Sequence, residues 1–362
     1  MSNPPVARFG LVGSGWRADF FARLARQAPD RFAVAGVVSR SAERRSEIER
    51  TWQVPVHSSI EELVAAGGCE FVLPCVPWSQ TPAVTRELVA AGCPVLTETP
   101  PAPDLAGLRQ LWFDVGATGL VQVAEQYRWM PGHAARLALL RDGLVGDVTS
   151  VQVSSTHLYH AISLIRGMLG VGLVPATVQA QTFRAPLANP LNPSGWTGET
   201  EPEDLTTTLA TVDFRNARMG VYDFTDNQWW NPLRARRIVV RGSLGEIVDD
   251  SVVRLIDPNT PVESRLLRRR AGTDLNLEGV DLQHISFDGR VVWRNQFDGA
   301  RFSEDDLAVV DLLAQTVAWS RDEAPPPYPL AEGCHDHLIS LAIGESIASG
   351  RPVTTTDQPW CS

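Results

Sequence analysis

The chain contains no lysine, because all 32 of its basic residues are arginine. This excludes any mechanism that needs a lysine ammonium group as acid, base or nucleophile. Acidic residues number 42, which gives a formal net charge of -10. A nucleic-acid-binding surface normally shows a basic patch or stripe, so we expect no nucleic-acid partner.

Long apolar runs are missing as well. No stretch approaches the ~20 residues that a membrane span requires, and Met1 to Arg8 lacks the apolar core of a secretion signal. The chain has five cysteines, an odd number without metal-ligand spacing: Cys69, Cys75, Cys93, Cys334 and Cys361. Such a set indicates free thiols in a reducing compartment. We therefore expect a cytoplasmic protein with no membrane partner and no metal site.

What the sequence does contain begins near its N-terminus. An apolar run ends at Val12 and is followed by the pattern Gly13-x-Gly15-x-x-Ala18, which opens a helical stretch. Gly13 allows a tight turn, Gly15 lets a pyrophosphate approach the backbone, and Ala18 keeps the helix close to the sheet. Free N–H groups at the start of the helix face the anion. We expect Ser14, Trp16 and Arg17 to take part in the same site, although a strand–helix turn without a ligand is the alternative.

A second apolar strand, from Phe32 to Val38, ends at Ser39-Arg40. An acidic residue here would bind the 2′-hydroxyl of NAD, whereas an arginine accommodates the 2′-phosphate of NADP. The sequence therefore favours NADP over NAD, unless Arg40 points to solvent. Strand and helix patterns alternate from residue 6 to about 125, which predicts an α/β fold with a doubly wound parallel sheet.

Further along, the chain resembles the glucose–fructose oxidoreductase, inositol dehydrogenase and MocA family. The resemblance covers nearly the whole chain and rests on these segments: Gly10-x-x-Gly13-x-Gly15-x-x-Ala18, Val76-Pro77, Ala91-Gly92-x-Pro94-Val95-Leu96-x-Glu98-x-Pro100, Glu125-Gln126-Tyr127-Arg128-Trp129-x-Pro131, Gly146-Asp147-Val148, Arg241-Gly242-Ser243-x-Gly245-Glu246 and Ala342-Ile343-x-x-Ser346-Ile347-x-x-Gly350.

The resemblance implies a Rossmann domain over residues 1–128 and a second α/β domain over 129–362. The second domain would contain a large, mainly antiparallel open sheet, through which the family commonly forms dimers or tetramers. A last helix, at about 333–349, would pack back on the first domain. By the same resemblance, the cofactor groove is lined by Val76, Pro77, Glu98 and Gln126.

Two departures from the family concern its catalytic residues. The family's Glu-Lys-Pro triplet, whose lysine assists proton transfer at the substrate hydroxyl, is Glu98-Thr99-Pro100 here. The family's Asp-x-x-x-His signature is matched by Thr156 and His160, so its aspartate is also absent.

The candidates for acid–base chemistry are therefore His157, Tyr159 and His160, with His160 as proton donor or acceptor. On helical spacing His160 shares a face with Ser163, and Tyr159 points elsewhere. By resemblance, Arg128 and Ser163 face the substrate. Two ordinary buried, hydrogen-bonded histidines are the alternative for this cluster.

In the second domain, residues 187–200 are rich in Pro, Asn and Gly and predict a long loop. Trp196 within this loop could stack on a sugar or anchor the loop on the core. Trp230, in the segment 226–232, could form a carbohydrate platform, cover the sheet or make a dimer contact. The basic cluster Arg265 to Arg270 indicates a solvated hairpin rather than a phosphate site.

Three functional hypotheses follow. The first is an NAD(P)-dependent oxidoreductase that acts on a secondary alcohol or ketone of a sugar, cyclitol or polyol. The second, also by resemblance, is a redox-assisted glycosidase, in which transient oxidation at sugar C3 acidifies the C2–H bond and permits elimination. The third, motivated by the two vacated catalytic positions, is a cofactor-binding regulatory or partner protein without turnover.

Overall fold

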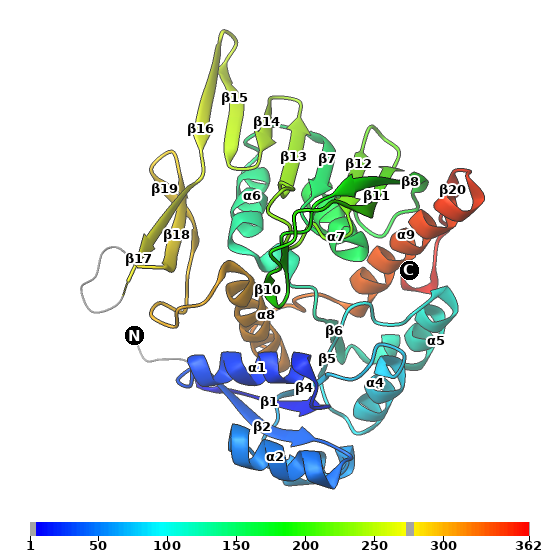
Figure 1. Ribbon diagram of the computed structural model, residues 1–362, viewed down its shortest axis with the longest axis vertical. Helices are drawn as coiled ribbons and strands as arrows, with labels where there is room; N and C mark the ends of the chain where they lie inside the picture. Colours follow the sequence, from blue (N-terminus) through cyan, green and yellow to red (C-terminus); the bar gives the residue numbers. More distant parts are fainter. Residues whose placement is uncertain (1–4, 273–278, 362) are drawn as a thin grey trace.

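The computed structural model describes residues 5–272 and 279–361, so the first four residues of the N-terminal stretch inspected for a secretion signal lie outside it. Figure 1 shows two layered α/β regions, with the N-terminal part below and the strands of the second domain above. The helices near the C-terminus return to the junction between them.

The first domain has a six-stranded parallel sheet of order β3-β2-β1-β4-β5-β6, which confirms the doubly wound sheet predicted from the sequence. Its strands are β1 (Ala7–Val12), β2 (Phe32–Val38), β3 (Val56–His57), β4 (Phe71–Pro74), β5 (Val95–Thr97) and β6 (Val121–Val123). Its helices are α1 (Trp16–Gln27), α2 (Ala42–Trp52), α3 (Ile60–Ala66), α4 (Thr81–Ala90) and α5 (Leu105–Val115), with the short helix η1 (Gly116–Thr118) after them.

Local sequence signals explain where these elements begin. The central strand β1 is buried from Phe9 to Val12, as the continuous apolar run of a strand covered on both faces requires. Ala18 is fully buried on α1, where its small side chain lets the helix approach the sheet. Ser41 caps α2 by accepting a hydrogen bond from the Arg44 N–H group.

The second domain is built on a nine-stranded sheet of order β16-β15-β14-β13-β7-β12-β11-β8-β20. Only the β7–β12 pair is parallel among its recorded pairings, so the sheet is mixed and mostly antiparallel. The strands are β7 (Val148–Ser154), β8 (Thr177–Leu187), β11 (Glu203–Asp213), β12 (Met219–Thr225), β13 (Arg237–Gly242), β14 (Gly245–Val248), β15 (Ser251–Asp257), β16 (Thr260–Arg265) and β20 (Val353–Thr354).

Two expectations for this domain need correction. Part of the stretch predicted as a patternless loop forms the hairpin β9 (Leu191–Asn192) and β10 (Gly195–Trp196). The pairing of the two short strands satisfies backbone N–H and C=O groups, which residue propensities do not predict. The arginine cluster is not a hairpin: it runs from the end of β16 into β17 (Leu267–Ala271). That strand joins β18 (Asp281–Phe287) and β19 (Arg290–Arg294) in a separate three-stranded sheet.

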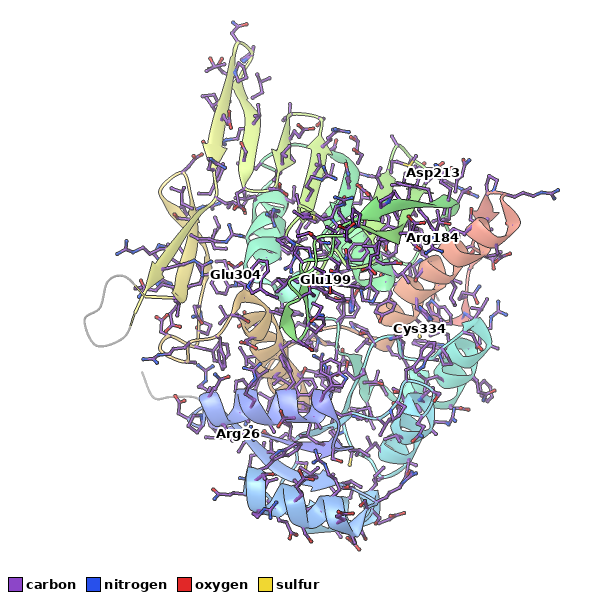
Figure 2. The ribbon with its side chains drawn as sticks, in the orientation of Figure 1. Arg26, Arg184, Glu199, Asp213, Glu304 and Cys334 are labelled. Atoms are coloured by element: carbon purple, nitrogen blue, oxygen red, sulfur yellow. The ribbon has the colours of Figure 1, made fainter. Side chains whose placement is uncertain are left out.

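The remaining helices follow the first sheet in the chain. They are α6 (Pro131–Arg141), α7 (Leu158–Leu169), α8 (Glu304–Ser320) and α9 (Leu330–Ser349), with the short helices η2 (Tyr127–Trp129) and η3 (Pro359–Cys361). Among them, α8 and α9 contact elements of the first domain. Cys334 and Leu338 of α9 belong to a buried cluster with Val95 and Val121 of the first sheet. Figure 2 shows Cys334 at this junction. Within the described ranges, no helix is long and apolar enough to cross a membrane.

Candidate active site

A cavity of about 270 Å³ lies at the carboxyl ends of β1, β2 and β4. Five of the residues predicted to bind the cofactor line it: Gly13, Ser14, Ser39, Arg40 and Val76. Pro77 follows Val76 in the turn between β4 and α4. The carboxyl edge of a doubly wound sheet is where such folds bind ligands, so the cavity lies at the expected place for a nucleotide.

The glycine turn fits a dinucleotide. Gly13 has φ +111°, and a Cβ there would lie 2.2 Å from the Cys75 carbonyl oxygen, so only glycine is tolerated. At Gly15, the N-cap of α1, no atom lies within 4 Å of an added Cβ. This open side leaves the backbone accessible to a pyrophosphate at the start of the helix.

Arg17 and Glu98 bind each other rather than standing free. Arg17 Nε lies 2.6 Å from Glu98 Oε1, and the guanidinium lies 4.7 Å from the ring centre of Phe21. The pair links the glycine turn to the end of β5. Trp16, in contrast, is exposed at the start of α1. The sequence analysis did not identify Arg44, whose Nη2 donates to the Ser14 carbonyl at 2.8 Å.

The centre of the candidate site is His160. Its Nδ1 lies 2.5 Å from Glu125 Oε2, and both side chains are buried. The other oxygen of Glu125 accepts a hydrogen bond from the Tyr127 N–H group at 2.9 Å. A carboxylate partner favours a proton on Nδ1 and leaves Nε2 as a hydrogen-bond acceptor. Glu125 lies two residues after β6, just before Gln126, the N-cap of η2, and is thus a candidate site residue that was not predicted from the sequence.

Aromatic rings surround this pair. The ring centres of Tyr127 and Tyr159 each lie 4.5 Å from that of His160, and His157 lies 5.0 Å from it. Burial, with a smaller contribution from His160, lowers the pKa of His157 to about 3, so this imidazole is neutral near physiological pH. His157 is the N-cap of α7, and its buried Nδ1 has no hydrogen-bond partner in the described part of the chain.

Tyr159 does not point away from the cluster, as helical spacing suggested. His157 lies outside the helix and Leu158 has φ +39°, so the first turn is distorted and brings Tyr159 against His160. Burial, and then the charge of Glu125, raises the pKa of Tyr159, so its hydroxyl remains a proton donor. Thr99 also acts on Tyr159, where it lowers the pKa of the phenol by a smaller contribution than these two.

The structure does not bring Arg128 and Ser163 to this cluster. Arg128 Nε donates to the Ser163 carbonyl at 3.0 Å and to its hydroxyl oxygen at 3.1 Å. The hydroxyl of Tyr328 donates to Ser163 Oγ at 2.8 Å. Ser163 is fully buried, and its hydroxyl is occupied by partners from other segments.

The two tryptophans predicted to contact substrate differ in position. Trp196 lies on β10 with 76% of its surface exposed. Trp230 stacks on Trp229 at 5.5 Å between ring centres, and Trp229 lies 4.7 Å from His157. Trp230 is therefore one ring removed from the histidine cluster.

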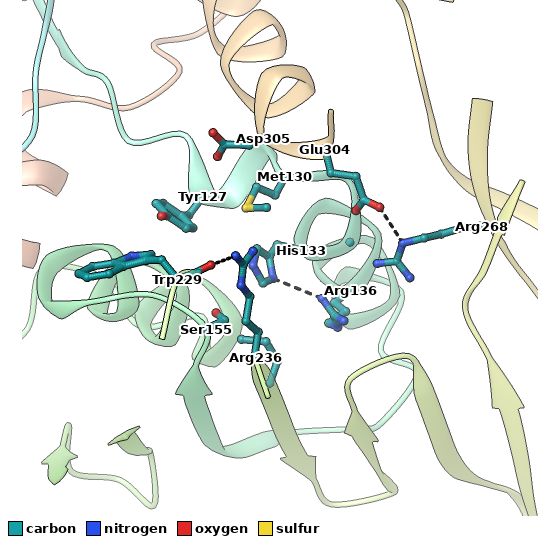
Figure 3. A pocket seen from close by; sticks show the side chains of 12 residues that line it. Tyr127, Met130, His133, Arg136, Ser155, Trp229, Arg236, Arg268, Glu304 and Asp305 are labelled. Atoms are coloured by element: carbon teal, nitrogen blue, oxygen red, sulfur yellow. Dashed lines mark hydrogen bonds and ion pairs between the residues drawn. The ribbon is translucent and has the colours of Figure 1, made fainter. Parts of the chain in front are cut away.

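A larger cavity, of about 400 Å³, adjoins the cluster through Tyr127 and Trp229 (Figure 3). Ser155, at the end of β7, and Asp305, in the first turn of α8, also line it. The described residues include no group of three or more His, Cys, Asp or Glu side chains arranged to hold a metal ion.

Comparisons with known proteins agree with this geometry. Residues 7–124 match the model of the GFO_IDH_MocA group, described as an oxidoreductase family with an NAD-binding Rossmann fold. No curated protein matches the chain.

Solved structures share the fold over almost the whole chain. An oxidoreductase from Agrobacterium radiobacter in complex with NAD+, L-tartaric acid and magnesium has a TM-score of 0.68 at 18% identity, covering 96% of this chain and 98% of that one. A putative myo-inositol dehydrogenase from Sinorhizobium meliloti 1021 has a TM-score of 0.67 at 16% identity, covering 97% and 100%. A levoglucosan dehydrogenase, in complex with NADH and levoglucosan, has a TM-score of 0.67 at 16% identity, covering 97% of this chain and 100% of that one. Residues 7–124 thus match the model of an oxidoreductase family with an NAD-binding Rossmann fold, and the chain as a whole shares the two-domain fold of these solved structures.

Proposed function

We propose that the protein is an NAD(P)-dependent oxidoreductase that acts on a secondary alcohol or ketone of a sugar, cyclitol or polyol. The observation that carries the proposal is the buried His160–Glu125 pair beside a polar cavity, next to a glycine turn that fits a dinucleotide. When bound, the nicotinamide of the cofactor supplies hydride acceptance or donation at the carbinol carbon.

The protein's own groups handle the proton. In the oxidative direction the hydroxyl proton of the substrate passes to His160 Nε2, while Nδ1–H donates to Glu125 and stabilises the resulting imidazolium. In the reductive direction the imidazolium returns the proton to the oxygen as the alcohol forms. Tyr159, held protonated by burial, donates a hydrogen bond to the same oxygen and takes over part of the role of the missing lysine.

The same proposal includes a preference for NADP. Arg40 is exposed at the cavity wall, and Arg44 and Arg45 lie within the first turn of the following helix. No acidic residue follows β2 directly. A cluster of guanidinium groups at the ribose end favours a 2′-phosphate over a 2′-hydroxyl.

Assembly and location complete the proposal. The face of the large sheet away from α7 and α9 exposes Gln179, Gln181 and Thr211 around a shallow hollow of about 360 Å³. We expect a homodimer or homotetramer through this face, and a cytoplasmic location.

The test is a turnover assay on purified protein with NADP+ or NAD+ and a panel of sugars, cyclitols and polyols, read by nicotinamide absorbance. We expect oxidation of at least one member, and a loss of roughly 10²- to 10⁴-fold in kcat for His160→Gln. His284→Gln, on β18 in the small three-stranded sheet, is the matched control and should keep full activity. In parallel, Arg40→Ala should weaken NADPH binding and spare NADH, whereas Arg50→Ala, at the other end of α2, should change neither.

Two outcomes would contradict the proposal. Tight nucleotide binding without turnover across the panel would favour a regulatory or partner protein. Cleavage of a glycoside without net NADPH formation would favour the redox-assisted glycosidase.

A further inference from the structure

The cavity beside the histidine cluster extends away from it toward a group of arginines. Its walls include Tyr127, whose ring lies 4.5 Å from that of His160, and Trp229, whose ring lies 4.7 Å from that of His157. A substrate whose reacting carbon lies at His160 would therefore extend its remaining substituents into this space. At about 400 Å³, the cavity has the size of a small-molecule site.

Three arginines line the cavity: Arg136, Arg236 and Arg268. Arg136 lies 3.1 Å from Asp250, and Arg268 binds both Asp250 and Glu304. Arg270 lies 2.9 Å from the same Glu304. Three guanidinium groups, two of which lie at the cavity wall, thus share two carboxylates.

Arg236, the third arginine of the cavity, differs from these in its partner. The partner recorded for its guanidinium within the described ranges is not a carboxylate but the backbone carbonyl of Trp229. Figure 3 shows the Arg236 side chain directed into the middle of the cavity, toward His133. Burial, and then Arg136, lowers the pKa of His133 well below its usual range, so this ring is neutral and can lie beside a guanidinium.

The carboxyl of Asp305, across the cavity from Arg236 in Figure 3, forms no recorded ion pair with the described residues. Burial raises its pKa, whereas the charges of Arg17 and Arg236 lower it. Among the described residues, the Arg236 guanidinium therefore has an acidic neighbour across the cavity but no carboxylate in direct contact.

Ser155 supplies an independent sign that a ligand binds here. Its side chain is 9% exposed and lines the cavity, yet its buried hydroxyl has no hydrogen-bond partner among the described residues. Native proteins rarely leave such a group unsatisfied unless a ligand or water completes it. Gly132 and His133, in the first turn of α6, line the same cavity, where the helix N-terminus favours negative charge.

We infer that the substrate carries an anionic group, a carboxylate or a phosphate, which binds to the Arg236 guanidinium and the Ser155 hydroxyl while the reacting carbinol lies at His160. A guanidinium presents parallel N–H donors that match two oxygens of such a group. The substrate class is thus an acidic sugar or polyol, either a uronate or a sugar phosphate. This inference rests on the proposed function in one respect, the position of the reacting carbinol at His160.

The test compares matched ligands that differ only in this group: D-glucose, D-glucuronate and D-glucose 6-phosphate. Each is titrated by calorimetry into wild-type protein, Arg236→Gln and Arg237→Gln. Arg237, the next residue along the chain, pairs with Asp223 at 3.3 Å, so its substitution removes the same charge outside the cavity. Where turnover is detectable, KM for each ligand is measured as well.

We expect at least one anionic sugar to bind tenfold or more tightly than glucose. Arg236→Gln should weaken that ligand roughly ten- to a hundredfold, the loss of a charge-assisted hydrogen bond, and should raise its KM while leaving glucose unchanged. Ser155→Ala should have a smaller effect of the same kind, and Arg237→Gln none. The arm that responds, glucuronate or glucose 6-phosphate, identifies carboxylate or phosphate as the group.

Equal binding of neutral and anionic sugars, no binding of either anion, or unchanged anion affinity in Arg236→Gln would overturn the inference. Failure of the proposed function gives a different result. In that case, anionic sugars would bind in a way that depends on Arg236, but nicotinamide absorbance would not change. Oxidation of neutral polyols at a rate that does not depend on Arg236 would instead support the proposed function and contradict this inference.

Discussion

Helix α7 presents two clusters of polar side chains that differ in how completely they are satisfied. On one side, Arg166 is fully buried and binds Asp336 at 2.6 Å and Glu332 at 2.9 Å, and the Tyr328 hydroxyl binds both Asp336 and Ser163. The carboxylates and hydroxyls of this network all have partners, whereas the buried Arg166 Nε has none among the described residues. At the N-terminal end, His157 and Ser155, two residues before it, each have a buried polar atom without a hydrogen-bond partner among the described residues.

The two ends of α7, a helix of 12 residues, thus differ in how their polar groups are paired, and we propose that they also differ in role. The ion pairs of Arg166 fix the position of α7 against α9, and the carboxylates and hydroxyls that they involve have little capacity left for a ligand. Unsatisfied groups at the edge of a cavity are costly in the free protein, and a polar ligand that completes them recovers that cost on binding. We therefore assign structure to the Arg166 network and chemistry to the His157–His160 end.

The largest effect on stability is expected from breaking the network of Arg166, Asp336 and Glu332. Arg166→Leu leaves the carboxylate of Asp336 buried without its main partner, which should lower the free energy of unfolding by about 3–5 kcal/mol. Denaturant titration measures this loss. In the double variant Arg166→Leu/Asp336→Leu no unpaired buried charge remains, so a large part of the stability should return. If the double variant is no more stable than the single one, the network does not act as a charge pair.

A smaller effect, on activity, is expected at the other end of α7. Glu125→Gln keeps the size of the side chain but removes the charge that orients His160 and stabilises its imidazolium. We expect kcat to fall by about ten- to a hundredfold, as for other residues that act through a catalytic group, with a change in the pH profile of kcat. Glu332→Gln, which alters a carboxylate that pairs with Arg166, is the control. An equal loss of kcat in both variants would show that Glu125 has only a structural role.

Much of the fold could be predicted from the sequence because its signals are local. The turn at Gly13 needs a backbone conformation that glycine alone adopts, and the buried run of β1 specifies a central parallel strand. The cap of α2 is equally local, because Ser41 accepts a hydrogen bond from Arg44, three residues further along the chain. These features depend on residues close together in the chain.

The site was harder to predict because its contacts join distant segments. Glu125 reaches His160 across 35 residues and a domain boundary, and nothing in the spacing of either motif indicates that pair. Ser163 illustrates the opposite error, since its helical register with His160 was correct but its partners come from η2 and from Tyr328, just before α9. Register identifies which residues share a helix face, whereas the surrounding elements decide which of them remain accessible.

The smallest expected effect compares two buried serines that differ in their partners. Ser163→Ala removes a hydroxyl that hydrogen-bonds to Arg128 and Tyr328. Arg128 keeps the Ser163 carbonyl as an acceptor and Tyr328 keeps Asp336, so we expect a loss of about 1 kcal/mol in unfolding free energy. Ser155→Ala removes a hydroxyl without a partner among the described residues, so the stability of the ligand-free protein should stay within about 0.5 kcal/mol or rise slightly. Denaturant titrations of both variants decide the matter. Similar losses at the two positions would mean that Ser155 has a partner in the folded protein, and its hydroxyl would then no longer point to a ligand.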